Sequence, residues 1–166
     1  MRFSTLNRKL HRWGAIISAL PILVILISGI ILQLKKDYDW IQPPSCKGKG
    51  QSPVVSFDRI LEAASTVEEA KINGWSDIDR LDVQPGKGLV KVQAKNSWEI
   101  QVDTETGEIL QSAYRLSDMI EDLHDGQFFH ASVKMWVFLP SGIILLLLWI
   151  SGIYLFLLPY LKRRRT

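Results

Sequence analysis

Two long apolar stretches, one near each end of the chain, dominate the pattern of hydrophobic and polar positions. The first covers residues 14–34 and the second residues 135–160, and neither contains a charged side chain. A helix of about 20 residues, rising ~1.5 Å per residue, crosses the ~30 Å hydrocarbon core of a bilayer. The pattern therefore predicts two transmembrane helices, over residues 14–34 and 133–161, with Lys134 reaching to the interface from the second.

The first apolar stretch has features that favour an uncleaved signal anchor. It is longer than the apolar region of a typical signal peptide, and no small-residue cleavage site follows it. Pro21 predicts a slight bend in the helix. Three Ser-Gly steps, at Ser28-Gly29, Ser141-Gly142 and Ser151-Gly152, are small enough for another helix to approach closely.

Residues 35–112 change character from an irregular segment to alternating apolar and polar positions. Pro and Gly residues predict a linker over residues 35–53. Ser56 is the expected N-cap of a helix from Phe57 to about Ala70, with one apolar face. That face comprises Phe57, Ile60, Leu61, Ala64 and Val67.

Period-two alternation then predicts strands over residues 78–83, 89–94, 97–102 and 108–111, separated by turns. Together with the helix they predict a small α+β domain over residues 54–112. Residues 113–132 return to helical spacing, and we expect this amphipathic segment to lie on the membrane surface and to place His124 beside the second span.

Charges are segregated along the chain. Residues 1–13 and 162–166 hold eight Lys and Arg and no acidic residue, so the middle holds 20 − 8 = 12 basic against 17 acidic residues, a net charge of −5. Basic ends beside membrane spans follow the positive-inside rule, which predicts two crossings with both termini in the cytoplasm. The bilayer accounts for the basic ends, and we expect no nucleic acid partner.

The chain offers few residues for catalysis or for a protein-held metal. Cys46 is the single cysteine, so no internal disulfide forms. Its Gly/Pro/Lys surroundings predict a flexible loop and a bystander thiol, with an intermolecular disulfide or lipid attachment as open alternatives. No Ser/His/Asp order, HExxH motif or phosphate loop is present, and the acidic residues at 103–108 are best explained as a strand-connecting turn.

Four short motifs, in order, resemble the PepSY-associated transmembrane family. They are residues 8–14 opening the first span, the hairpin at residues 100–110, the Leu-His-Asp-Gly at 123–126, and residues 150–155 within the second span. The resemblance implies a bacterial inner-membrane protein whose PepSY domain, inserted between the two helices of a transmembrane hairpin, lies in the periplasm.

Some larger members of that family resemble ferric-siderophore reductases, which carry b-type haems between histidines of their membrane helices. His11 and His124 match family histidines, whereas His130 falls where many members have a small residue. This chain departs from those relatives in having two predicted spans instead of four or more, and no flavin or nicotinamide fingerprint. The resemblance therefore implies an accessory or electron-transfer subunit more readily than a complete enzyme.

A neutral imidazole is a good axial ligand for haem iron. His11 and His124 lie at opposite ends of the predicted helices, roughly 30 Å apart, and cannot share one haem within a protomer. A bis-histidine haem b site would need a second copy, a partner membrane subunit, or His124 paired with His130. Two functions stay open: a haem-associated subunit in extracytoplasmic iron or metal redox chemistry, and a non-enzymatic anchor or regulatory subunit in which all three histidines are interfacial polar residues.

Overall fold

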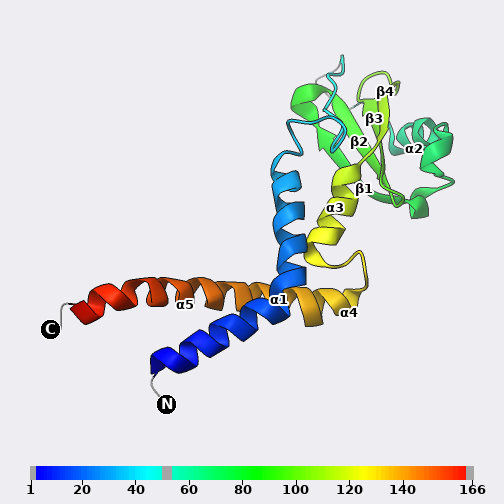
Figure 1. Cartoon of the computed structure of the whole chain (residues 1–166). Coiled ribbons are helices and arrows are strands. Elements are labelled where there is room, and N and C mark those ends of the chain that lie inside the picture. The colour runs from blue at the N-terminus through cyan, green and yellow to red at the C-terminus, as the bar shows by residue number, and fades with distance from the viewer. Residues whose placement is uncertain (1–2, 50–53, 164–166) are drawn as a thin grey trace. The chain divides into compact units, whose positions relative to one another are not determined.

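The computed structural model describes residues 3–49 and 54–163 (Figure 1). The side chains of the predicted basic tail, residues 162–166, lie outside the described part. The helices are α1 (Phe3–Gln33), α2 (Phe57–Ser65), α3 (Leu116–Asp125), α4 (Ala131–Val133) and α5 (Leu139–Arg163), with a π-helical turn at Lys134–Phe138. The strands are β1 (Ile78–Gln84), β2 (Leu89–Ala94), β3 (Trp98–Asp103) and β4 (Ile109–Tyr114). Single 3₁₀ turns occupy Glu68–Ala70, Trp75–Asp77 and Pro85–Lys87.

Two helical stretches are long and apolar enough to cross a membrane. They are Thr5–Gln33 and Ala131–Tyr160, and only 11% and 6% of their most apolar windows are buried within the protein. The core helix of a soluble protein would bury its apolar face, so these helices are suited to a lipid surrounding. By length and composition, the structure confirms the prediction of two membrane helices flanking a small domain.

The first helix differs from its prediction at its N-terminal end. It begins at Phe3, so Arg8, Lys9 and Arg12 belong to the same helix as the apolar stretch. Figure 1 shows that α1 bends about midway along its length, and Pro21 lies inside it. Proline removes one helical hydrogen bond and its ring displaces the preceding turn, which explains the bend.

The chain divides into two compact units. The membrane unit comprises residues 1–31 and 120–166, and the sheet unit comprises residues 32–119. In the sheet unit the four strands form an antiparallel meander in the order β1-β2-β3-β4 (Figure 1). The predicted strands are confirmed, although β4 extends to Tyr114 and is longer than the alternation indicated.

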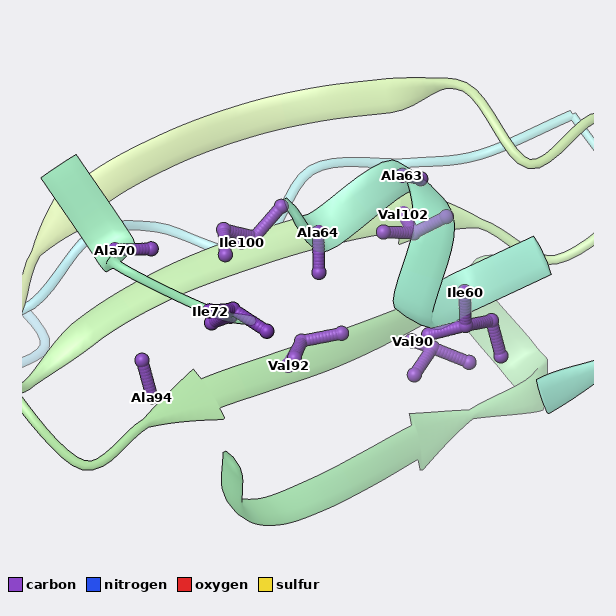
Figure 2. Close-up of a cluster of buried hydrophobic side chains, with 10 residues drawn as sticks. All are labelled: Ile60, Ala63, Ala64, Ala70, Ile72, Val90, Val92, Ala94, Ile100 and Val102. Atoms are coloured by element: carbon purple, nitrogen blue, oxygen red, sulfur yellow. The ribbon is translucent and has the colours of Figure 1, made fainter. Parts of the chain in front are cut away.

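The hydrophobic core of the sheet unit lies between α2 and one face of the sheet. Figure 2 shows Val90, Val92, Ile100 and Val102 pointing toward residues of the helical side. The cluster comprises Ile60, Ala63, Ala64, Ala70, Ile72, Val90, Val92, Ala94, Ile100 and Val102. Ser56 caps α2 as predicted, because its side chain accepts a hydrogen bond from the Arg59 amide.

Two details of the predicted helix are wrong. Helix α2 ends at Ser65 and a separate 3₁₀ turn follows, and Phe57 is 64% exposed instead of packing in the core. The ring of Phe57 instead meets Trp75 edge to face, with centroids 6.1 Å apart. Phe57 is the first residue of this nine-residue helix, whose buried residues are Ile60, Ala63 and Ala64.

The opposite face of the sheet is polar but buried. Residues 41–49, which we call the covering segment, lie across it. The Cys46 amide donates to Gln101 Oε1 at 2.7 Å, Gln101 Nε2 donates to the Pro44 carbonyl at 2.7 Å, and the Lys49 amide donates to Asp103 at 2.7 Å. The segment has no regular secondary structure, yet these bonds hold it in place, contrary to the flexible loop expected around Cys46.

A buried ionic cluster stands on the same polar face. Glu99 is 1% exposed and receives hydrogen bonds from Lys91 at 2.9 Å, from Gln101 at 2.7 Å and from Arg115. Arg115 also bonds Asp118 at 3.1 Å. Burial would raise the pKa of Glu99, but the hydrogen bonds and charges of Lys91 and Arg115 hold it below its ordinary value.

Candidate functional site

In the membrane unit a histidine ring lies over a Ser-Gly step at two places. At the first, His124 Nδ1 is 3.0 Å from the Ser28 hydroxyl. A β-carbon at Gly29 would lie 3.3 Å from Cε1 of the same ring, so glycine allows this approach. The small-residue step that was predicted to accept a neighbouring helix therefore accepts an imidazole.

The hydrogen bonds of Ser28 indicate which nitrogen of His124 carries the proton. Ser28 Oγ lies 2.6 Å from the Val24 carbonyl, and its single proton is donated there. The hydroxyl must then accept from His124, which places the proton on Nδ1 and leaves the Nε2 lone pair available. Metal-binding histidines are commonly held in this way by a partner on their other nitrogen.

At the second place His11 lies over the Ser-Gly step of α5. His11 Nδ1 is 2.6 Å from Ser151 Oγ, and a β-carbon at Gly152 would lie 3.7 Å from the ring. Ser151 also donates toward the Leu148 carbonyl at 3.1 Å. The hydroxyl can donate its single proton to His11 Nδ1, or donate to Leu148 while accepting from a protonated Nδ1, so the contact is compatible with either tautomer of His11.

The two pairs lie far apart along the spans. Seventeen residues of α1 separate His11 from Ser28 (28 − 11), which is about 25 Å along a helix. Helices α1 and α5 run antiparallel, because His11 contacts Ser151 while Gly14, one turn later in α1, faces the earlier residue Leu148, which a β-carbon on Gly14 would meet at 3.4 Å.

His11 and His124 each line a cavity. His11, Ser151, Tyr154 and Asn7 contribute to a cavity of about 530 Å³ whose other walls are Leu and Ile side chains. The Nδ2 atom of Asn7 is buried there without a hydrogen-bond partner. A buried amide that lacks a partner is costly, so this wall offers an unused donor to a bound group.

His124 lines a second cavity, of about 420 Å³, together with Asp125, Lys134 and apolar residues of α5. Lys134 is ion-paired with Asp125. Burial would raise the pKa of Asp125, but bonds from Lys134 and from the Gln127 amide hold it below its ordinary value. The carboxylate therefore stays charged beside the histidine.

The loop after His124 is fixed by a glycine. Gly126 has φ +83°, and a β-carbon there would lie 2.4 Å from the ring of Phe138. Phe138 itself ends the π-helical turn Lys134–Phe138. Such turns insert an extra residue into a helix and are frequent at functional sites, and this one leads directly into α5.

His130 has a different environment from the other two histidines. Its Nδ1 accepts a hydrogen bond from the Ser132 amide at 3.1 Å and thereby caps the short helix α4. In the neutral ring the proton then lies on Nε2, which removes the lone pair that an iron atom would need. The structure does not pair His130 with His124 through any hydrogen bond of the described residues.

Sequence reasoning identified the histidines but missed their partners. Ser28 and Ser151 were interpreted only as packing positions, and Asn7 was not considered. A pattern search for polar residues inside apolar stretches would have found both serines, because a buried hydroxyl in a membrane helix needs a hydrogen-bond partner. Among the described residues no group of three or more His, Cys, Asp or Glu is placed to hold a metal ion.

Comparison with known proteins places this architecture in a family. No match is found among curated proteins, and none among solved structures. The family model described as "PepSY-associated TM region" matches residues 8–165, which include nearly all of the first span, the whole second span, both histidine–serine pairs and the whole sheet unit. The chain is a two-pass membrane protein and belongs to the PepSY-associated transmembrane family.

Proposed function

We propose that this protein is a haem-associated electron-transfer subunit in iron or metal redox chemistry, with His11 and His124 as axial ligands of haem b. The observation that carries the proposal is the Ser28–His124 pair. Because the Ser28 hydroxyl donates to the Val24 carbonyl, it accepts from Nδ1 of His124, and the lone pair on Nε2 is left available for iron. A haem held by two neutral imidazoles takes up and releases one electron at its iron.

The surroundings of both histidines suit a porphyrin. Each imidazole lines a cavity with mainly apolar walls, of about 530 Å³ at His11 and about 420 Å³ at His124. These volumes fall in the range of small-molecule and cofactor sites, about 300–1,000 Å³. The unpartnered Asn7 amide in the first cavity and the Lys134 ammonium in the second are donors for acidic ring substituents.

Each site needs a second axial ligand from outside this chain. The two histidine–serine pairs are about 25 Å apart along α1, too far for one iron. His130 is occupied as a helix cap. We therefore propose that a second copy, or a partner membrane subunit, contributes the missing histidine to each site.

Absorption spectroscopy tests the proposal. The full chain, purified in detergent from haem-replete cells, is expected to show a Soret band that shifts on reduction with dithionite. His11→Ala and His124→Ala should each lower the haem content, and the double variant should abolish it. A colourless wild-type protein, or spectra unchanged in both variants, would refute the proposal.

The proposed location is the bacterial inner membrane, with both termini in the cytoplasm and the sheet unit in the periplasm. The support is the charge pattern, since eight basic residues flank the two spans at the chain ends. A reporter fused after Thr166 should be active only if that end is cytoplasmic. A reporter found in the periplasm at this end would refute the proposed orientation.

A second candidate function is a non-enzymatic anchor or regulatory subunit. The observation favouring it is the exposed pair Phe57–Trp75 on the sheet unit, 64% and 43% accessible. Exposed aromatic residues are enriched where proteins dock onto partners. Under this alternative the protein lacks haem, and Phe57→Ser with Trp75→Ser would abolish co-purification of a partner retained by wild type.

A further inference from the structure

The sheet unit contains a basic cavity that the haem proposal does not use. It has a volume of about 430 Å³ and lies between the start of the covering segment and the β1–β2 hairpin. Four lysines line it, against one carboxylate: Lys35, Lys36, Lys87, Lys91 and Asp82. Such an excess of ammonium groups around a concave site attracts anions.

The walls of the cavity consist of backbone and side chains that are held in place. Pro43 is buried and Pro44 follows it, so the backbone on this side has restricted φ angles and lacks two amide donors. On the other side Asp82 and Lys91 are cross-strand partners. Lys91 is 3% exposed, and its ammonium is fixed at 2.9 Å from Glu99.

A polar atom in the wall is unsatisfied. Gln42 lines the cavity, and its Oε1 is buried without a hydrogen-bond partner. Buried amide groups without partners are rare because they lose their hydration without replacement. A ligand that carries hydroxyl donors as well as a negative charge would satisfy Gln42 and the lysines together.

The position along the chain indicates where such a ligand comes from. Lys35 and Lys36 follow two and three residues after Gln33, the last residue of the first membrane-spanning stretch, with Leu34 between. Phospholipid phosphates lie at this depth, just outside the hydrocarbon core. A free phosphate ester from solution would present the same chemistry.

From this cavity we infer a binding site for a phosphate group bearing hydroxyls, of the kind found in the headgroup of an anionic phospholipid. Lys36 and Lys87, both exposed, would contact the phosphate oxygens, and Gln42 would contact a hydroxyl. The site is independent of haem binding and stands whether or not haem is present.

Calorimetric titration of the full chain in a neutral detergent tests the inference. The titrants are inorganic phosphate, glycerol phosphate, short-chain phosphatidylglycerol and short-chain phosphatidylcholine. The double variant Lys36→Gln/Lys87→Gln is expected to bind the phosphate ligands at least about tenfold more weakly, because charged hydrogen bonds are lost. Lys47→Gln, which removes an exposed lysine of the covering segment outside the cavity, should bind as wild type does.

Comparison of the titrants distinguishes the source of the ligand. Tighter binding of phosphatidylglycerol than of glycerol phosphate assigns the site to lipid, and equal binding assigns it to a soluble ester. Gln42→Leu should weaken glycerol phosphate more than inorganic phosphate. The inference is overturned if no phosphate compound binds, or if the double variant and Lys47→Gln lose affinity equally while hydrogen exchange shows the sheet unit intact.

Discussion

Ser28 of α1 accepts a hydrogen bond from His124 across 3.0 Å, and this contact links two segments 96 residues apart in the chain. It also sets the orientation of the imidazole, because the serine proton is committed to the Val24 carbonyl. Ser28 therefore positions the His124 imidazole, a role separate from the stability of α1 itself.

Replacing Ser28 by Ala should therefore weaken haem binding at His124. Loss of a residue that orients a metal-bound histidine typically lowers metal affinity by about 10–100-fold. The measurement is the haem content of purified protein and its titration with haem after extraction. Ser141→Ala is a matched control, because Ser141 makes the same type of bond, 2.6 Å to the Val137 carbonyl, and nothing lies against Gly142. Equal effects of the two changes would contradict the positioning role.

Gly126→Ala should destabilise the membrane unit. Its φ of +83° costs an L-residue about 1–2 kcal/mol, and the clash of the new methyl group with Phe138 adds about 1–3 kcal/mol. The thermal midpoint of the detergent-solubilised protein should fall clearly. Gly142→Ala, inside α5 with open space around it, should leave the midpoint unchanged or raise it slightly. A Gly126→Ala protein as stable as wild type would contradict this account of the loop.

Glu99→Gln should loosen the sheet. Without the carboxylate, Lys91 and Arg115 are left as buried charges facing a neutral amide, and breaking a buried pair in this way costs about 3–5 kcal/mol. Hydrogen exchange of the β2 and β3 amides in the full chain should accelerate markedly. Glu62→Gln, which removes an exposed partner of Arg59, serves as the control and should change exchange little.

The same carboxylate predicts acid sensitivity. The pKa of Glu99 in the folded protein is lowered from its ordinary 4.5, because the bonds and charges of Lys91 and Arg115 outweigh burial. A depressed carboxylate pKa stabilises the fold fully above the unfolded-state pKa, and this stability is lost as the pH falls through the folded-state pKa. Protection of β3 amides should therefore decline below about pH 4.5, and the decline should be shallower in Glu99→Gln. Equal slopes in both proteins would assign the acid sensitivity to other groups.

His130→Ala should leave the haem spectrum intact while reducing stability. The imidazole caps α4 through the Ser132 amide, and loss of an N-cap costs about 0.5–2 kcal/mol. His130→Asn should preserve the cap and restore the thermal midpoint. If His130→Ala removed haem while His130→Asn retained stability but also lacked haem, His130 would be a ligand after all.

Much of the fold follows from patterns that are local in the sequence. Apolar stretches without charges predicted both spans, and strict alternation predicted β2 at its observed bounds. The burial of Glu99 and Gln101 was not predictable, because a polar face is normally solvent-exposed and only tertiary contact with the covering segment buries it. Phe57 was misassigned because its spacing fits the apolar face, whereas its ring meets Trp75 outside the core.

In the candidate site, too, some features could be predicted from the sequence and others depend on tertiary packing. His11 and His124 were predicted because they match histidines of the resembled family and because imidazole is a good haem ligand. Their pairing with Ser151 and Ser28 depends on how α1 and α5 pack against each other, which local periodicity does not encode. The cap role of His130 depends on the helical stretch beginning at Ala131, two residues before the predicted start of the second span.

The covering segment also decides how the sheet unit can be isolated. A soluble fragment cut at the apparent domain boundary near residue 54 would lose the backbone groups that satisfy Gln101 and Asp103, and would present Glu99 and its partners to water. The Ser117 amide donates a hydrogen bond to the Ile41 carbonyl at 2.8 Å, so the two ends of the fragment 41–119 are joined. Expression of residues 41–119 should yield a stable monomeric protein for crystallisation or NMR, whereas residues 54–112 should aggregate.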